Sequence, residues 1–100
     1  MEHYTILIVR YNNACRVLPA HQYVRSGDEI TFRTFGTAAT ILIPNGHLFQ
    51  KGERFVEIAA GEQVELAVGK PGSGVYPYSV FCDATNDFAV GDSSPDLILY

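Results

Sequence analysis

The sequence predicts an all-β sandwich of about seven or eight strands, folded as one domain over residues 1–100. Two observations carry this prediction. Short β-branched or aromatic segments alternate with turn signals along the chain, at the spacing typical of all-β proteins. No segment repeats its apolar residues with the 3.6-residue period of a helix. Residues 47–54 (HLFQKGER) have room for one helical turn, and Gly52 argues against more.

The first two predicted strands cover residues 4–9 (YTILIV) and 15–25 (CRVLPAHQYVR), with Asn12-Asn13 as the turn between them. The first is a continuous β-branched and aromatic run, as expected of a buried strand. The second contains Pro19. Because proline removes a ladder donor, this strand suits a sheet edge or a bend better than a central position.

Alternation is clearest in the third predicted strand, residues 29–33 (EITFR). Ile30 and Phe32 share one face and polar side chains the other, which indicates a half-buried strand. The same pattern in residues 64–68 places Leu66 and Val68 inside.

The remaining predicted strands cover residues 39–43, 55–59, 75–82 and 97–100. In the strand over residues 75–82, we expect Val80 and Cys82 to face the core. Pro77 then has to stand near the beginning of the strand or at a bulge, because it cannot donate to a ladder.

Composition excludes several classes of function. The net charge is -4 and the seven basic residues are scattered, which argues against a nucleic-acid partner. The longest apolar run is far too short to span a bilayer. Two cysteines cannot form a disulfide scaffold. The sequence predicts a cytoplasmic protein if Met1 is the native start, and a periplasmic or secreted one if a leader has been removed.

Residues 26–32 (SGDEITF) and 78–82 (YSVFC) resemble two blocks of the cupredoxins, the blue-copper family. The first block is similar to the family's glycine-acid turn and the strand after it. The second is similar to the aromatic strand that leads to the copper cysteine. The resemblance spans nearly the whole chain. It implies a two-sheet Greek-key sandwich with a metal site at one end, beneath three loops.

The copper ligands that this resemblance implies are mostly missing. A blue-copper centre takes two imidazoles, a thiolate and a weak axial thioether. The family pattern Cys-x2-His-x4-Met falls on Cys82, Thr85 and Val90, and the first histidine falls at Thr40 or a neighbour. Residues 81–100 contain neither histidine nor methionine. We therefore expect these four positions to be vestigial, with no bound copper and no other cofactor.

The other candidate donors do not replace the missing ligands. Among the three histidines, His3 and His47 are expected far from Cys82, and His21 is the nearest. The sequence favours Cys82 as a small buried apolar group over a reactive thiol, since Asp83 beside it disfavours a thiolate. Cys15 is expected toward the same end of the sandwich. A bond between the two cysteines is geometrically conceivable, but we expect free thiols because no oxidising address is visible.

The sequence thus favours a non-catalytic cupredoxin-like module, not an enzyme, that acts in protein–protein interaction or as a structural subunit. The alternative is a metal-binding or redox protein with an atypical site built on Cys82. Asp83, Asp87 and Asp92 would form the polar rim of a contact patch for a protein partner or a second copy. Phe88 is either the centre of that patch or a plug in the vacant metal cavity. The patch residues are Phe35, Ala38, Ala39, Ala84, Phe88, Ala89 and Val90.

Overall fold

The computed structural model describes residues 1–91 and 94–100, and within them it contains strands and no helix. Within these residues, no helix is long and apolar enough to cross a membrane. The strands, in chain order, are β1 (His3–Tyr11), β2 (Ala14–Leu18), β3 (His21–Val24), β4 (Glu29–Phe35), β5 (Ala39–Leu42), β6 (Phe55–Ile58), β7 (Gln63–Ala67), β8 (Gly74–Pro77), β9 (Ser79–Cys82), β10 (Asp87–Phe88) and β11 (Asp96–Leu99).

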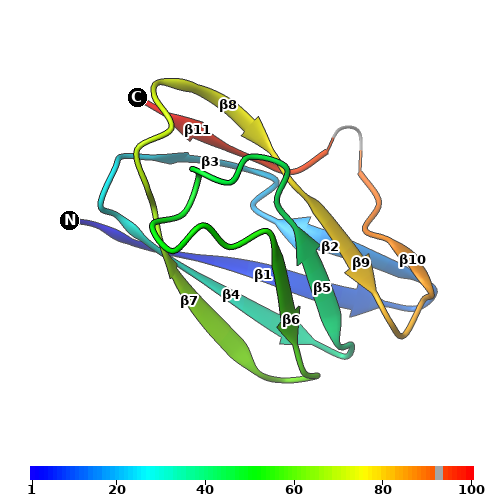
Figure 1. Cartoon of the computed structure of the whole chain (residues 1–100). Coiled ribbons are helices and arrows are strands. Elements are labelled where there is room, and N and C mark those ends of the chain that lie inside the picture. Colours follow the sequence, from blue (N-terminus) through cyan, green and yellow to red (C-terminus); the bar gives the residue numbers. More distant parts are fainter. Residues whose placement is uncertain (92–93) are drawn as a thin grey trace.

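One layer of the sandwich is a sheet with the order β2-β1-β4-β7 (Figure 1). Its two central strands, β1 and β4, run parallel, and the outer pairs are antiparallel. The register sets His3 opposite Glu29 at one end and Val9 opposite Phe35 at the other. Both strands therefore begin at one end of the sandwich and finish at the other.

The other layer combines the sheets β10-β9-β5-β6 and β3-β11-β8. Tyr78 alone separates β8 from β9, so the single strand predicted over residues 75–82 takes part in both sheets. Pro77 ends β8, at the interruption. Pro19 separates β2, which pairs with β1, from β3, which pairs with β11. The predicted bend at Pro19 is thus confirmed.

The core lies between the two layers and contains every side chain that alternation placed inside. Tyr78 joins them from the interruption, and its ring packs edge-to-face on Phe32, with centroids 5.5 Å apart. This pair connects the two layers of the sandwich. The six residues predicted to face inward are all 4% exposed or less: Ile30, Phe32, Leu66, Val68, Val80 and Cys82.

The single strand predicted over residues 75–82 is thus divided into β8 and β9, and two further elements differ from the prediction. The two-residue strand β10 was missed, because so short a strand carries no periodicity. The helical turn allowed for residues 47–54 is absent. Instead, this segment forms a loop in which Phe49 makes an isolated bridge with Val68 and both Leu48 and Phe49 are buried. The two buried apolar side chains hold the loop against the end of β7.

Candidate functional site

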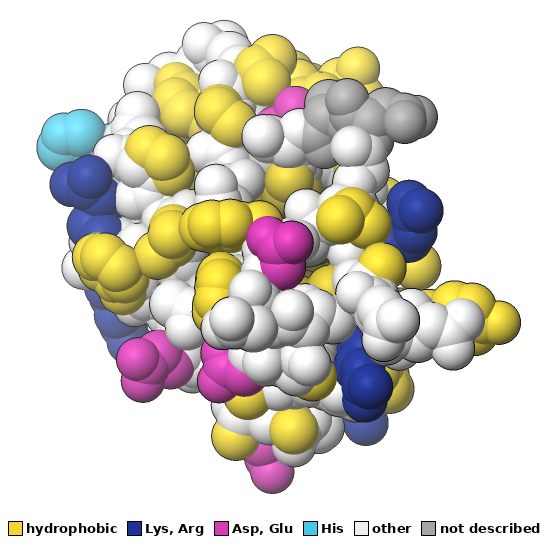
Figure 2. Space-filling model, turned by 90° about the vertical axis from the view of Figure 1, so that its right-hand side faces the viewer, with side chains coloured by type: hydrophobic (Ala, Val, Ile, Leu, Met, Phe, Trp, Pro, Cys, Tyr) yellow, Lys and Arg dark blue, Asp and Glu magenta, His cyan; other side chains and the backbone are white. Residues whose placement is uncertain are grey.

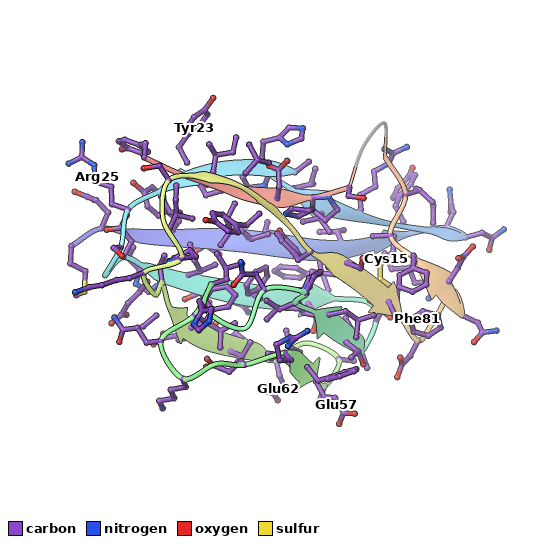
Figure 3. All side chains as sticks on the ribbon, turned by 45° about the horizontal axis from the view of Figure 1, so that its top comes forward. Cys15, Tyr23, Arg25, Glu57, Glu62 and Phe81 are labelled. Atoms are coloured by element: carbon purple, nitrogen blue, oxygen red, sulfur yellow. A yellow bond between two sulfur atoms is a disulfide. The ribbon has the colours of Figure 1, made fainter. Side chains whose placement is uncertain are left out.

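Cys15 and Cys82 form a disulfide between β2 and β9, across the two layers of the sandwich (Figure 3). The expectation of two free thiols was wrong. Cys15 pairs with Arg10 at the end of β1, and Cys82 pairs with Ala39 at the start of β5. Both cysteine side chains face inward, with exposures of 1% and 0%, so their sulfur atoms meet in the core. We call this end of the molecule the disulfide end.

The three vestigial positions other than Cys82 are occupied as follows. Thr40 pairs with Phe81, the residue before the inward-facing Cys82. Because successive side chains of a strand point to opposite faces, the Thr40 side chain lies on the outer face of the sheet. The Thr85 hydroxyl donates to the Cys82 carbonyl at 3.4 Å. Val90 is 44% exposed, and its backbone N–H donates to the Cys15 carbonyl at 2.8 Å. None of these side chains supplies an imidazole or a thioether beside Cys82.

The three histidines lie apart from one another. His3 is at the opposite end of β1 from Cys15, with Nε2 2.6 Å from the Thr31 hydroxyl. His47 follows β5 beyond the end that lies away from Cys82. His21 Nδ1 is 2.8 Å from the Asp96 carboxylate. Within residues 1–91 and 94–100, no three His, Cys, Asp or Glu side chains are arranged to hold a metal ion. The donor set does not fit the copper centre that the resemblance implies.

Comparison with solved structures decides the fold. A purple cupredoxin from Nitrosopumilus maritimus superposes with a TM-score of 0.61 at 15% identity, over 97% of this chain and 99% of that one. A pseudoazurin from Sinorhizobium meliltoi gives 0.59 at 18% identity, over 100% of this chain and 75% of that one. The fold is that of the cupredoxins. An amicyanin variant in its reduced state gives 0.59 at 14% identity, over 96% and 82% of the two chains. No protein-family model matches the sequence, and no curated protein does.

On this cupredoxin fold, copper(II) added to the protein is expected to give no intense thiolate-to-copper absorption band in the visible spectrum. Cys82, which occupies the position of the copper cysteine, is in a disulfide, and no imidazole lies beside it among the described residues. The measurement is a visible spectrum during copper titration, with and without a reductant. A strong band in the reduced sample would show that Cys82 recruits ligands after the disulfide opens.

Phe88 is not a plug in a metal cavity, because the space beside Cys82 is taken by Cys15. The Phe88 ring packs edge-to-face on Phe81, with centroids 5.3 Å apart, and it is 48% exposed. Phe81 alternates with the inward-facing Val80 and Cys82, so the pair belongs to the outer face of β9 and β10. Alternation alone could have identified Phe81 as part of this surface.

The structure brings together only part of the predicted patch. Ala39 is in the core, and Ala38 and Ala89 are half-buried. Ala84 is exposed in the turn after β9. Phe35 lies on the outer face of the other layer, where the Arg33 guanidinium stands 5.1 Å from the centre of its ring.

Phe88, Ala89 and Val90 line an open hollow of about 440 Å³, and Ser79 and Val80 of β9 also line it. We define the Phe88 surface as Phe81, Phe88, Ala89 and Val90. Its four residues come from β9, β10 and the segment that follows β10.

The sheet that carries the Phe88 surface has acidic side chains and no basic ones. β5, β6, β9, β10 and the turn between the last two contain Glu57, Asp83 and Asp87 but no lysine or arginine. The register aligns Glu57, Thr40, Phe81 and Phe88 in one row across the sheet. Figure 2 looks onto the disulfide end and shows acidic side chains among hydrophobic ones, with Lys and Arg at the margins. Asp92, predicted in the same rim, lies outside the described residues.

Proposed function

We propose that this chain is a non-catalytic cupredoxin-fold module that docks a protein partner through the Phe88 surface. The observation that carries the proposal is the aromatic pair of the half-buried Phe81 and the exposed Phe88, on a sheet whose strands contain no lysine or arginine. Exposed apolar groups gathered in one place, with polar groups around them, are typical of interaction sites on folded proteins.

The partner that this surface fits is a protein whose apolar contact is bordered by lysine or arginine. Glu57, Asp83 and Asp87 would meet those cations, and complementary charge favours both encounter and register. Cations also bind favourably over aromatic rings such as Phe88. Two copies of the surface would bring like charges together. This disfavours self-association, which remains an outcome of the experiment below.

The alternative, a metal or redox site built on Cys82, has lost its support. Both sulfur atoms are in the disulfide, both cysteines are buried, and a thiolate is the metal ligand and the nucleophile. The disulfide favours an oxidising compartment, since such bonds persist there and are rare in the cytosol. We therefore propose that the module acts in the periplasm or outside the cell.

Replacing Phe88 with alanine is expected to weaken partner binding about tenfold or more, as for a central contact residue. The free energy of unfolding should change by no more than about 1 kcal/mol, because much of the ring is already in water. Immobilised wild-type and Phe88→Ala proteins would be compared for proteins retained from extracts of the native host. Sedimentation velocity of each would measure self-association.

Phe55→Ala is the matched control, because Phe55 is 74% exposed on β6 of the same sheet, beside the end of β5 away from Cys82. It should retain the same proteins as the wild type. Binding should also fall with added salt and in the Glu57→Gln/Asp83→Asn double variant. Equal retention by Phe88→Ala and the wild type, per folded molecule, would exclude the Phe88 surface as the contact. Loss of self-association in Phe88→Ala would identify a second copy as the occupant.

A further inference from the structure

A second hollow lies at the end of the sandwich away from the disulfide. It has a volume of about 550 Å³ and is formed by the loop after β5 and the turn after β7. β7 runs antiparallel to β4 and ends beside Glu29, which places this turn at the opposite end from Cys15. The hollow is therefore separate from the Phe88 surface.

Backbone contacts hold the two segments together tightly. The Gln50 N–H donates to the Ala67 carbonyl at 2.8 Å, and the Gly69 N–H donates to the Leu48 carbonyl at 2.7 Å. The Ser26 hydroxyl donates to the Gly69 carbonyl from the other side. A Cβ at Gly69 would stand 2.5 Å from the His47 carbonyl oxygen, so only glycine allows this approach. The walls of the hollow are thus fixed by the backbone.

This packing brings the lysines of the chain together. Its two lysines, Lys51 and Lys70, are 19 positions apart in the sequence, and both line the hollow with His47. No acidic residue lines it. The rest of the wall includes the Gln50 side chain and three glycines, Gly46, Gly52 and Gly69.

Among the described residues, neither lysine has a carboxylate oxygen within 4.0 Å. Among the described residues, the ion pair within 4.0 Å is His21–Asp96, although the chain has eleven acidic residues. On its other side, Lys51 borders a smaller hollow of about 190 Å³ lined by three glutamates: Glu29, Glu53 and Glu65. That neighbouring hollow is acidic, so the positively charged surface is confined to the larger hollow and does not extend past Lys51.

We propose that this hollow binds a small polyanion that carries phosphate or carboxylate groups. The two ammonium groups would meet the charged oxygens as point charges with rotatable donors. The Gln50 side-chain amide and the part of the wall formed by Gly46 and Gly52 would contact the rest of the ligand.

The test is titration of the full chain with inorganic pyrophosphate, inorganic phosphate and citrate, followed by backbone amide shifts and calorimetry. Saturable shifts are expected at residues 46–52 and 69–70. Lys51→Gln and Lys70→Gln should each weaken binding about threefold or more, and the double variant about tenfold or more, as for one or two charge contacts near the surface. Tighter binding of pyrophosphate identifies a phosphate ligand, and tighter binding of citrate a carboxylate ligand.

Arg33→Gln is the control for net charge, because Arg33 is exposed on the outer face of the layer formed by β2, β1, β4 and β7. It should bind each anion as the wild type does, and so should Phe88→Ala. The proposal is wrong if none of the three anions gives saturable shifts in the hollow, or if Arg33→Gln weakens binding as much as the lysine variants. It is also wrong if Lys51→Gln and Lys70→Gln alter stability while the affinity is unchanged.

Discussion

Replacing Cys82 with serine is expected to lower the free energy of unfolding by about 4 kcal/mol or more. The disulfide joins residues 67 positions apart, and closing a loop of that length removes about 4 kcal/mol of chain entropy from the unfolded state. The new hydroxyl would also be buried in an apolar environment. If Cys82 were a free thiol instead, replacing it with serine would lower the free energy of unfolding by only about 1–3 kcal/mol, through lost packing and the buried hydroxyl.

Denaturant unfolding with and without a thiol reductant measures this effect. The reduced wild type should be destabilised nearly as much as Cys82→Ser, and the reductant should have no further effect on the variant. Cys15→Ser is the matched control, since it removes the same bond from the other side. A wild-type midpoint that does not respond to reductant, together with two titratable thiols in the folded protein, would show that the bond does not contribute to the native state.

Replacing Tyr78 with alanine is expected to cost about 3–5 kcal/mol, the range for removing a large aromatic side chain from a core. Tyr78 is 2% exposed and its ring packs on Phe32 of the opposite layer. Burial, with the nearby charge of Asp96, raises the pKa of Tyr78 well above its ordinary value, so the phenol stays neutral. The change would leave a cavity where the two layers meet.

Tyr78→Phe separates the contribution of the ring from that of the hydroxyl. Among the described residues, the Tyr78 hydroxyl has no hydrogen-bond partner although it is buried. Removing it should leave the free energy of unfolding within about 1 kcal/mol of the wild type, or raise it, because an unpaired buried polar group is itself unfavourable. Both variants would be measured by thermal and denaturant unfolding. A loss in Tyr78→Phe as large as in Tyr78→Ala would mean that the hydroxyl is bonded after all.

Much of the fold could be predicted because strands have a two-residue period that is visible in the sequence. Ile30 and Phe32 alternate with polar residues, and both are fully buried in β4. Pro19 removes a ladder donor, and the chain bends there as predicted. The missing histidines and methionine could also be counted without a structure. These properties depend on neighbours in the chain, so they can be predicted from the sequence alone.

What the sequence left open depends on which strands become neighbours. Cys15 and Cys82 are bonded because β2 and β9 face each other across the core. Lys51 and Lys70 share a hollow because Gly69 packs on the preceding loop. Phe35 and Phe88 fall on opposite outer faces because β4 and β10 belong to different layers. The sequence by itself determined which side of β4, β7 and β9 is apolar. The tertiary structure alone decided which side chains meet, since that depends on pairing between strands far apart in the chain.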